Sequence, residues 1–594
     1  MASEIKANDY DGGGSRQTLV LAITIGTLGI LLWFRNLLSA GIATHLWADD
    51  FDSNFLRWTA EWGFYALGQK HSWDLFWNAP IFFPHPNTLA YSDSLLTFQL
   101  IYTPLRWVGL PVLAALYVGL GIFAVSCFSL TVLLLRQLKL FSPLESCIIA
   151  YAGHFSLMMA NFLPHYQLFG FHTAPPFIIS LYLFLSCRKL RWLLLSQALY
   201  VMGSCFAAYL APSLVVIGLG LVIIMAPSVI KESSWKEWRR LVVPSALTSL
   251  LFGFILYQIQ MKFYIQMLGS TETQSLEEIA IYAANPGSLF SGRSVNSYWW
   301  KPFGGGYSRN GQWESAYFPG FLLLLGLVAG AFRLIGAPQK AIDLPLRRLA
   351  VGMLCLAALA LIVSWGPYVE NQKAPFFFMI KVAPFLKNTR AIGRYGMFAA
   401  LPLGVMLVVC LRCITGKAMG TCRGTALAVV TLIALAIESL PTGKAFAYKE
   451  PIGDRHTQFA TIIKPGQPVA ELPCHAAGHL ETIRRIMEQM NGGLYHHGHL
   501  VLGYSGRSSP ETALLIHLDQ RLAAGALTFG EMLRHLKELG VQAILINEDR
   551  YSPSVVAQIE EQTIMRAGYH EVPRSGEGFR LLKRGPVIDT HEFG

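Results

Sequence analysis

The sequence of 594 residues contains little charge, since only 14% of its residues are Asp, Glu, Lys or Arg, whereas soluble globular chains carry about 25%. Hydrophobic residues make up 53% of the chain, and its mean hydropathy is +0.42. Cysteine is also scarce: of nine scattered residues, only Cys474 lies clearly outside the apolar segments and their flanks. These shortages exclude an ordinary soluble domain and a disulfide scaffold, and they predict an integral membrane protein.

Several motifs of common enzymes are missing as well. The chain has no Gly-rich phosphate loop, no His-Glu-x-x-His and no Gly-x-Ser-x-Gly, so nucleotide-driven chemistry and those two hydrolytic mechanisms have no support. The patterns His496-His497-x-His499 and Cys474-His475 resemble metal ligands, but they do not form a full set at zinc spacing. The sequence therefore offers no ready-made cofactor site.

Long apolar stretches are abundant. Stretches of about 17 to 25 residues, each able to cross a hydrocarbon core of about 30 Å, recur from Leu19 to Leu440. We predict an α-helical polytopic membrane domain over residues 1–440 with about eleven transmembrane helices. Their expected positions are 18–34, 110–135, 144–162, 174–187, 191–209, 212–228, 241–260, 319–333, 349–365, 396–411 and 424–440.

The basic residues predict the orientation of these helices. If the N-terminus is cytoplasmic, the segments on that side contain 18 basic and seven acidic residues, a net charge of +11. This satisfies the positive-inside rule at every short loop and equals the net charge of the whole chain. The positive charge is therefore a signal of topology, and no nucleic-acid partner is expected.

The opposite, outer side is expected to hold the long segments. They are three loops at about 35–109, 261–318 and 366–395 and a tail at 441–594. The tail alternates strand-like and helical patterns and predicts a soluble α/β domain. Its expected strands are Pro468–Leu472, Val541–Ile546 and Phe579–Leu582, and its expected helices are Glu481–Met490 and Thr528–Leu539.

The first outer loop opens with three carboxylates, Asp49, Asp50 and Asp52. Such a cluster can bind a divalent cation such as Mg²⁺ or Mn²⁺, or it can supply a general base. The alternative is a solvated helix cap at the membrane edge. Aromatic residues at helical spacing follow, from Phe55 to Tyr65, and predict a helix that lies in the membrane interface.

Further candidate residues lie in all three outer loops. A stiff run from Phe82 to Asp93 offers His85 and Asp93, and residues 40–100 have a net charge of −4. The third loop has a net charge of +4 and ends in Arg390 and Arg394, which can clamp a phosphate or simply contact lipid headgroups. Weaker candidates for substrate contact are His165 and Glu314, whereas His154 is expected to be a hydrogen-bonded core residue.

Short motifs along most of the chain resemble the GT-C superfamily of polytopic glycosyltransferases, in particular a group of bacterial members. The most specific is the run Phe82-Phe83-Pro84-x-Pro86-x-Thr88-Leu89-Ala90-Tyr91-Ser92-Asp93. The others are Asp50 with its neighbours, His165, Tyr317-Phe318-Pro319-Gly320, Arg390-x-x-x-Arg394-Tyr395 and Gly503-Tyr504-Ser505-Gly506.

This resemblance implies inverting transfer of a sugar from a polyprenyl-phosphate donor to a glycan, lipid or protein acceptor, on the outer face of the bacterial cytoplasmic membrane. It implies that Asp50, or else Asp49, is the general base. Asp52 or Asp93 would orient the acceptor or help to hold a metal ion, although many members have Glu at the position of Asp93. Arg390 and Arg394 would neutralise the departing lipid phosphate.

Three other functions compete with this interpretation. An O-antigen ligase or polymerase would depend on outer-loop Arg and His instead of a first-loop acid. A transporter or flippase of lipid-linked glycans would need ionisable groups inside the spans and an internal repeat, and the sequence shows few such groups and no repeat. A noncatalytic assembly protein would function through its tail.

Overall fold

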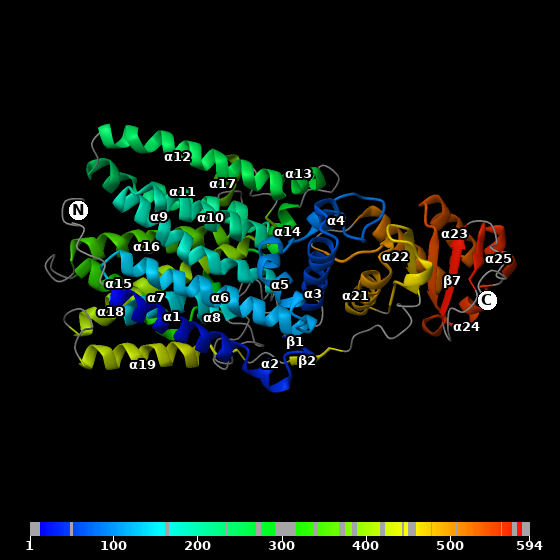
Figure 1. Cartoon of the computed structure of the whole chain (residues 1–594), viewed down its shortest axis with the longest axis horizontal. Coiled ribbons are helices and arrows are strands. Elements are labelled where there is room, and N and C mark those ends of the chain that lie inside the picture. Colours follow the sequence, from blue (N-terminus) through cyan, green and yellow to red (C-terminus); the bar gives the residue numbers. More distant parts are fainter. Residues whose placement is uncertain are drawn as a thin grey trace. The chain divides into compact units, whose positions relative to one another are not determined.

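A computed structural model represents the protein (Figure 1). Contacts divide the chain into two compact units. The first contains residues 1–48, 95–262 and 272–446, and the second contains residues 49–94, 263–271 and 447–594. The structure describes residues 12–47, 52–160, 165–232, 235–268, 275–291, 317–336, 343–367, 375–382, 389–415, 422–441, 445–448, 459–476, 478–505, 509–559, 561–572 and 579–584.

The first unit is a bundle of helices. Its helices are α1 (Gly12–Trp33), α2 (Arg35–Ala40), α5 (Leu96–Trp107), α6 (Val112–Gln137), α7 (Pro143–Phe155), α8 (Leu157–Ala160), η3 (Tyr166–Thr173), α9 (Ala174–Cys187), α10 (Leu190–Phe206), α11 (Leu210–Glu232), α12 (Trp235–Leu256), η4 (Tyr257–Met261), α14 (Leu276–Ile281), η5 (Pro286–Phe290), α15 (Phe321–Gly336), α16 (Leu344–Ser364), α17 (Pro375–Val382), η12 (Ile392–Ala399), α18 (Ala400–Thr415) and α19 (Cys422–Glu438). Strand β1 (His45–Trp47) pairs with β2 (Ala445–Ala447).

Every one of the eleven expected stretches contains a helix, and the protein is a multi-pass membrane protein. Seven helical segments in the described part of the chain are long and apolar enough to cross a bilayer. The other four stretches form the shorter helices α7, α10, α15 and α19. The seven long segments are Arg16–Trp33, Val112–Gln137, Tyr166–Cys187, Leu210–Pro227, Arg240–Met267, Leu344–Ser364 and Ile392–Thr415.

Helix α7 shows why one of these helices is short. It begins at a capping box, in which the Ser142 hydroxyl accepts from the Glu145 main-chain N–H and the Glu145 carboxylate accepts from the Ser142 N–H. It ends at Ser156, whose main chain is extended. Glu145 also forms an ion pair with Arg412 of α18 at 2.6 Å, so the beginning of α7 is tied to the end of α18.

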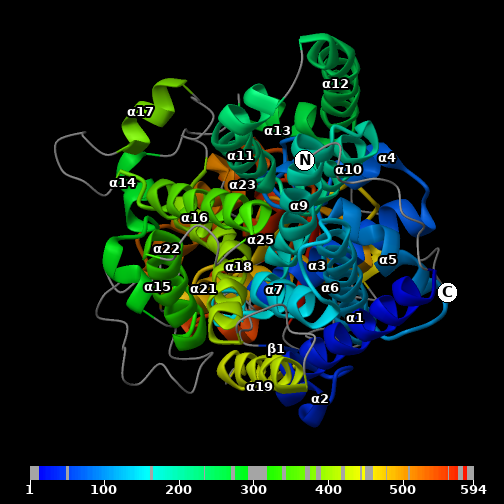
Figure 2. The same cartoon turned by 90° about the vertical axis from the view of Figure 1, so that its left-hand side faces the viewer.

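Close packing around α18 depends on residues without bulky side chains. Figure 2 shows α18 between α7 and α15. A Cβ atom on Gly404 of α18 would lie 2.7 Å from the Cβ of Ala152 in α7, and one on Gly326 of α15 would lie 2.7 Å from the Cα of Leu407 in α18. Small residues at such contacts let helix backbones approach closely, which is how helices in lipid gain packing energy.

The second unit contains a five-stranded mixed sheet of order β4-β3-β5-β7-β6 (Figure 1). Strands β4, β3 and β5 are parallel, and β7 runs antiparallel to both β5 and β6. The expected strands and helices of the tail are found at or near their predicted positions. The strands are β3 (Pro468–Leu472), β4 (His499–Leu500), β5 (Ala543–Asn547), β6 (Tyr569–Glu571) and β7 (Phe579–Arg584), and the helices are α21 (His479–His496), α22 (Pro510–Ala523), α23 (Phe529–Glu538), η13 (Glu548–Arg550), α24 (Pro553–Val556) and α25 (Glu561–Arg566).

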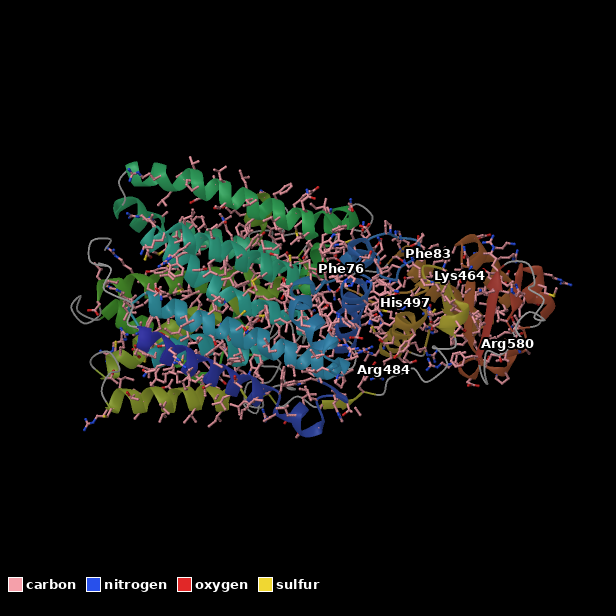
Figure 3. The ribbon with its side chains drawn as sticks, viewed as in Figure 1. Phe76, Phe83, Lys464, Arg484, His497 and Arg580 are labelled. Atoms are coloured by element: carbon pink, nitrogen blue, oxygen red, sulfur yellow. The ribbon has the colours of Figure 1, made fainter. Side chains whose placement is uncertain are left out.

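The second unit also includes much of the first expected loop. This loop contributes α3 (Asp52–Gly63), η1 (Phe64–Gln69), α4 (Trp73–Trp77) and η2 (Thr88–Tyr91), and α13 (Lys262–Leu268) begins at the edge of the unit. The segment around Phe83, a residue labelled in Figure 3, pairs with the chain at β4. The Phe83 N–H donates to the Leu500 carbonyl at 2.9 Å, and the Leu500 N–H donates to the Pro80 carbonyl at 3.0 Å.

Helix α3 packs on α21 through its aromatic residues. The Trp58 indole donates to the Met490 carbonyl at 2.8 Å, and the Arg57 guanidinium donates to the Asn491 side chain. Trp58 and Trp62 are buried, with 0% and 1% of their surface exposed. This contradicts the expectation of a helix that lies in the membrane interface, because the aromatic side chains form part of a protein core instead.

Candidate functional site

The residue that precedes the acidic cluster is held by two tyrosines of the first unit. The Trp47 N–H lies 3.0 Å from the Tyr117 hydroxyl of α6 and 3.1 Å from the Tyr166 hydroxyl of η3. The two hydroxyls are 2.7 Å apart. All three residues are buried, so the chain enters the acidic cluster from a fixed main-chain position.

Asp49 and Asp50 lie outside the described residues, but Asp52, two residues after Asp50, is described and belongs to the second unit. Asp52 is the first residue of α3, and its Oδ1 accepts a hydrogen bond from the Tyr504 hydroxyl at 3.0 Å. Tyr504 belongs to the Gly503-Tyr504-Ser505-Gly506 motif of the tail. The described residues on both sides of the predicted bases are therefore held by tyrosine hydroxyls.

Helix η3 connects the region of Trp47 to that of Arg394 within the first unit. Tyr166 at its beginning contacts Trp47, and Phe171 further along contacts both Tyr209 and Phe398, with ring centroids 5.7 Å and 4.9 Å apart. Five residues of a 3₁₀-helix span about 10 Å. The Arg394 guanidinium lies over the Tyr209 ring, 5.3 Å from its centroid.

Arg390 has different partners from Arg394. Its guanidinium lies over the ring of Tyr282, donates to that hydroxyl at 2.7 Å and approaches the Glu278 carboxylate at 3.5 Å. The side chains of Arg390 and Glu278 are 36% and 39% exposed, so this ion pair is weak. The two arginines predicted to clamp one phosphate are thus held by different aromatic rings, and one already has a carboxylate partner.

The remaining predicted residues fall in several environments. His165 is buried and directly precedes η3, which places it next in sequence to Tyr166. His85 forms an ion pair with Glu511 of α22 at 2.7 Å, and Asp93 is half-buried in the segment after η2. Glu314 lies outside the described residues. The structure places Asp52, His85 and Asp93 in the second unit and His165, Arg390 and Arg394 in the first.

The ion pair of His85 stabilises the ionised form of its partner. Burial raises the pKa of the Glu511 carboxyl, but the hydrogen bond from His85 and further donors outweigh burial and lower that pKa below its usual value. Nearby, burial lowers the pKa of His499, whose Nε2 lies 2.9 Å from the Ile81 carbonyl. The motif around Phe82 and Phe83 is therefore bonded to the tail by both main chain and side chains.

Each unit has histidines in its core, His154 and His172 in the first and His496 in the second. The Nε2 of His154 lies 2.9 Å from the Thr131 hydroxyl and its Nδ1 lies 2.9 Å from the Nδ1 of His172, which confirms the expectation of a hydrogen-bonded core residue. The Nε2 of His496 lies 3.2 Å from the Glu471 carboxylate. Across the described residues, which do not include Asp49 and Asp50, no three His, Cys, Asp or Glu side chains are grouped as metal ligands.

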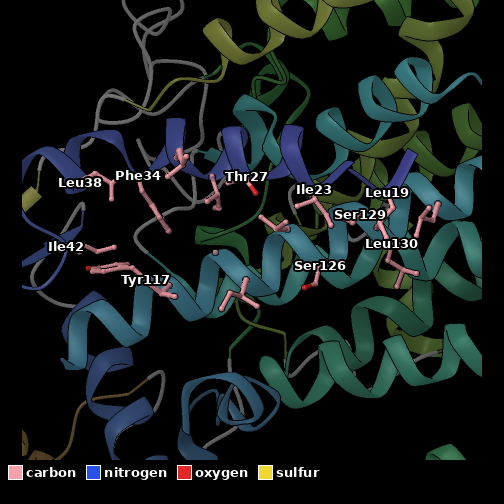
Figure 4. A pocket seen from close by; sticks show the side chains of 17 residues that line it. Leu19, Ile23, Thr27, Phe34, Leu38, Ile42, Tyr117, Ser126, Ser129 and Leu130 are labelled. Carbon is pink, nitrogen blue, oxygen red and sulfur yellow. The ribbon is translucent and has the colours of Figure 1, made fainter. Parts of the chain in front are cut away.

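An apolar groove of about 660 Å³ lies between α1 and α6 in the first unit (Figure 4). Its lining runs along α6 from Tyr117 to Leu133 and along α1 from Leu19 to Leu31, and it continues beyond α1 at Phe34. The rise from Tyr117 to Leu133 along α6 is about 24 Å, which is most of the thickness of the hydrocarbon core. Tyr117 therefore both lines the groove and holds Trp47.

Sequence reasoning missed the tyrosines that organise this region, namely Tyr117, Tyr166, Tyr209 and Tyr282. One signal was present: a tyrosine in or beside an apolar stretch has a hydroxyl that needs a hydrogen-bond partner once it is buried. The partner itself could not be identified, because Trp47 is bonded through its main chain, which every residue possesses.

Comparisons with known proteins bear on the fold. No protein-family model matches the chain, and no curated protein matches it significantly. A solved structure of the arabinofuranosyltransferase AftD from Mycobacteria aligns with a TM-score of 0.57 at 15% identity, over 97% of this chain and 40% of that one. A structure of a mutant of the same enzyme gives 0.57 at 14% identity, over 97% and 42%.

An archaeal oligosaccharyltransferase, AglB from Archaeoglobus fulgidus, aligns with a TM-score of 0.48 at 10% identity, over 97% of this chain and 75% of that one. The present chain spans about two fifths of the length of AftD. The fold defines a polytopic membrane protein with helices and a mixed-sheet region. The chain shares its fold with the solved arabinofuranosyltransferase, which agrees with the fold class expected from the sequence motifs.

Proposed function

We propose that the protein is an inverting glycosyltransferase that moves a sugar from a polyprenyl-phosphate donor to an acceptor hydroxyl. The carrying observation is that η3 contacts both Trp47, the described residue before the acids, and Tyr209, the ring beneath Arg394. Trp47, which precedes the candidate bases in the sequence, and the ring beneath Arg394 thus both contact one element of the first unit. The shared fold with a solved arabinofuranosyltransferase supports the same class of reaction.

The proposed reaction assigns the base to the acidic cluster, with Asp50 as first choice and Asp49 as second. The carboxylate accepts the proton of the acceptor hydroxyl while that oxygen forms a bond to the anomeric carbon of the donor sugar. The bond from this carbon to the phosphate oxygen breaks, and the lipid phosphate leaves with the electron pair. Attack opposite the leaving group inverts the configuration at the anomeric carbon.

Arg394 is the cation that we assign first to the leaving phosphate. A guanidinium that stacks on an aromatic ring keeps its N–H donors in the plane of the group, where they can point at phosphate oxygens. Arg390 is second, because Tyr209 and Phe171 connect Arg394 to η3, whereas Arg390 is held by Tyr282 and Glu278. A fixed positive charge lowers the barrier by stabilising the negative charge that develops on the phosphate.

In this proposal the acceptor, a glycan, lipid or protein, lies on the outer face of the bacterial cytoplasmic membrane. The supporting observation is the charge of the connecting segments, since those that face inward under this orientation contain 18 basic residues against seven acidic ones. The same orientation puts the N-terminus in the cytoplasm and the tail outside. Asp49, Asp50 and Asp52 also supply the oxygen ligands that Mg²⁺ or Mn²⁺ would need.

The decisive experiment compares Asp50→Asn and Asp49→Asn with Asp74→Asn, the same change at an exposed acid of the same loop. Each variant is expressed in cells that lack the protein, and mass spectrometry of membrane lipids and surface glycans measures transfer. Deletion should cause a polyprenyl-phosphate sugar to accumulate. Asp50→Asn should preserve that accumulation, because losing a general base costs about 10²- to 10⁴-fold in rate.

Asp74→Asn should restore the normal lipids in this experiment. If Asp50→Asn and Asp49→Asn both restore them fully, the aspartate-base mechanism is wrong, and an enzyme that depends on arginine and histidine becomes the better description. If no lipid-linked sugar accumulates after deletion, the proposed donor is wrong.

A second experiment separates the two arginines. Arg394→Gln should lower the rate of transfer by about 10²- to 10³-fold, which is typical for the loss of one preorganised group that stabilises transition-state charge. Arg390→Gln should lower it less, since Arg394 is the guanidinium that we assign first to the leaving phosphate. The comparison uses initial rates measured with membranes from the deletion strain as the source of donor. Equal rates for the two variants would contradict this order.

A further inference from the structure

We propose that Tyr117 and Tyr166 are positioning residues that fix the main chain from which the catalytic acids extend. This inference rests on the proposed function, because it concerns how the candidate base is held. Neither tyrosine is assigned to the reacting groups themselves. Their hydroxyls meet at Trp47, and Asp49 and Asp50 follow Trp47 by two and three residues in the sequence.

Several hydrogen bonds hold the main chain of Trp47. The Trp47 N–H is shared between the two hydroxyls at 3.0 and 3.1 Å. Tyr166 donates to the Trp47 carbonyl at 3.3 Å, and the two hydroxyls are hydrogen-bonded to each other at 2.7 Å. Both the N–H and the C=O of one residue are therefore engaged, which fixes the position of its peptide groups.

Packing alone would not require these hydroxyls. Trp47, Tyr117 and Tyr166 are each 1% exposed, and Phe34, which links α1 to α2, packs edge-on against both Trp47 and Tyr117, with ring centroids 5.0 and 5.7 Å apart. Phenylalanine at both tyrosine positions would keep these aromatic contacts. Burying a hydroxyl is costly unless it is hydrogen-bonded, and both hydroxyls are bonded to the main chain of Trp47 and to each other.

Fixing this point matters because a general base functions only within a narrow geometry. Productive catalytic groups must be held within about 0.5 Å, and a displacement of 1 Å can cost about 10²-fold in rate. Only Ala48 separates Trp47 from Asp49 in the sequence. Loosening Trp47 should therefore lower the maximal rate of transfer while leaving donor binding unchanged.

The test uses Tyr117→Phe, Tyr166→Phe and the double variant in the full-length protein. Tyr151→Phe is the matched control, since Tyr151 is a buried tyrosine whose hydroxyl contacts a side chain, that of Ser439 at 3.4 Å. Hydrogen–deuterium exchange measures protection in peptides that cover residues 44–52 and, for comparison, in peptides of α6 and α18. Initial rates are measured against increasing amounts of membranes from the deletion strain, which supply the donor.

In the double variant we expect faster exchange in the peptides around Trp47, unchanged exchange in α6 and α18, and a maximal rate lowered by about 10- to 100-fold. The half-saturating amount of membranes should stay the same. A variant that is merely misfolded would instead lose protection in α6 and α18. The control Tyr151→Phe should change neither exchange near Trp47 nor the rate.

Two results would overturn this inference. One is unchanged exchange near Trp47 in the double variant, and the other is a full transfer rate despite faster exchange there. The proposed function fails separately, through full activity of both Asp50→Asn and Asp49→Asn. Inactive aspartate variants combined with a fully active double tyrosine variant would therefore refute the positioning role and leave the proposed reaction standing.

Discussion

Acidification should weaken the second unit through His496. This side chain is fully buried, its Nδ1 accepts the Gly498 N–H at 2.9 Å, and its Nε2 lies 3.2 Å from the Glu471 carboxylate. Burial lowers the pKa of His496 from 6.5 to about 4. Protonation would also break the bond from Gly498, because Nδ1 would become a donor.

The magnitude follows from the difference between the folded and unfolded states. The unfolded chain keeps a histidine pKa of about 6.5, so it binds the proton more tightly than the folded chain. The stability contributed by neutral His496 is complete above pH 6.5 and is lost as the pH falls from 6.5 toward 4. At pH 5 the loss is about 2 kcal/mol, from 1.5 pH units at about 1.36 kcal/mol each.

Hydrogen–deuterium exchange in the full-length protein in detergent provides the assay. Opening free energies of β3 and α21 are compared at pH 7 and pH 5, after correction for the intrinsic exchange rate. His497, labelled in Figure 3, lies beside His496, and burial together with His496 and Lys70 lowers its pKa to about 4 as well. Variant His496→Gln isolates the first of these histidines, and His475→Gln serves as a control.

The wild type and His475→Gln should lose stability between pH 7 and pH 5, and His496→Gln should lose about 2 kcal/mol less. The opposing influence is Glu471, whose negative charge favours protonated His496. If Glu471 outweighs burial, the wild type will lose no more stability between pH 7 and pH 5 than His496→Gln does. That result would refute the reasoning from burial.

Two further predictions concern packing and a buried ion pair. Gly503→Ala should destabilise the second unit by about 1 to 3 kcal/mol, because the new Cβ would lie 2.7 Å from the Phe82 ring. Hydrogen–deuterium exchange in β4 measures the effect, and adding Phe82→Leu to the variant should reverse part of it. Arg412→Leu should lower the free energy of unfolding by about 3 kcal/mol or more, because it leaves the fully buried Glu145 without its ion-pair partner. Thermal unfolding in detergent measures this loss, and adding Glu145→Gln should recover stability.

The membrane helices could be predicted because apolar length is a local property. All eleven expected stretches contain helices, since about 20 apolar residues leave the chain few alternatives in lipid. The membership of the second unit could not be predicted in the same way. Phe83 pairs with Leu500 through main-chain groups, and such hydrogen bonds are not marked by any residue type.

The charged residues of the candidate site could be selected from the sequence, but the tyrosines that contact their neighbours could not. The acids near Asp50 and the arginines at 390 and 394 were found because charge is rare in this sequence. Their neighbours were missed because a tyrosine in an apolar stretch resembles any other aromatic core residue until its partner is known. The aromatic residues of α3 led to a wrong prediction for a related reason. The membrane interface and a protein core favour the same aromatic side chains.

The pairing of Phe83 with Leu500 also has a consequence for how the protein is made. The ribosome synthesises Phe83 417 residues before Leu500, and at about 5 to 20 residues per second this delay is about 20 to 80 s. Throughout that time the membrane helices are being inserted while the segment at Pro80–Phe83 has no partner strand. Completion of the second unit is therefore among the last steps of biogenesis, and inserted chains with an unpaired first loop should be detectable by pulse-labelling and proteolysis.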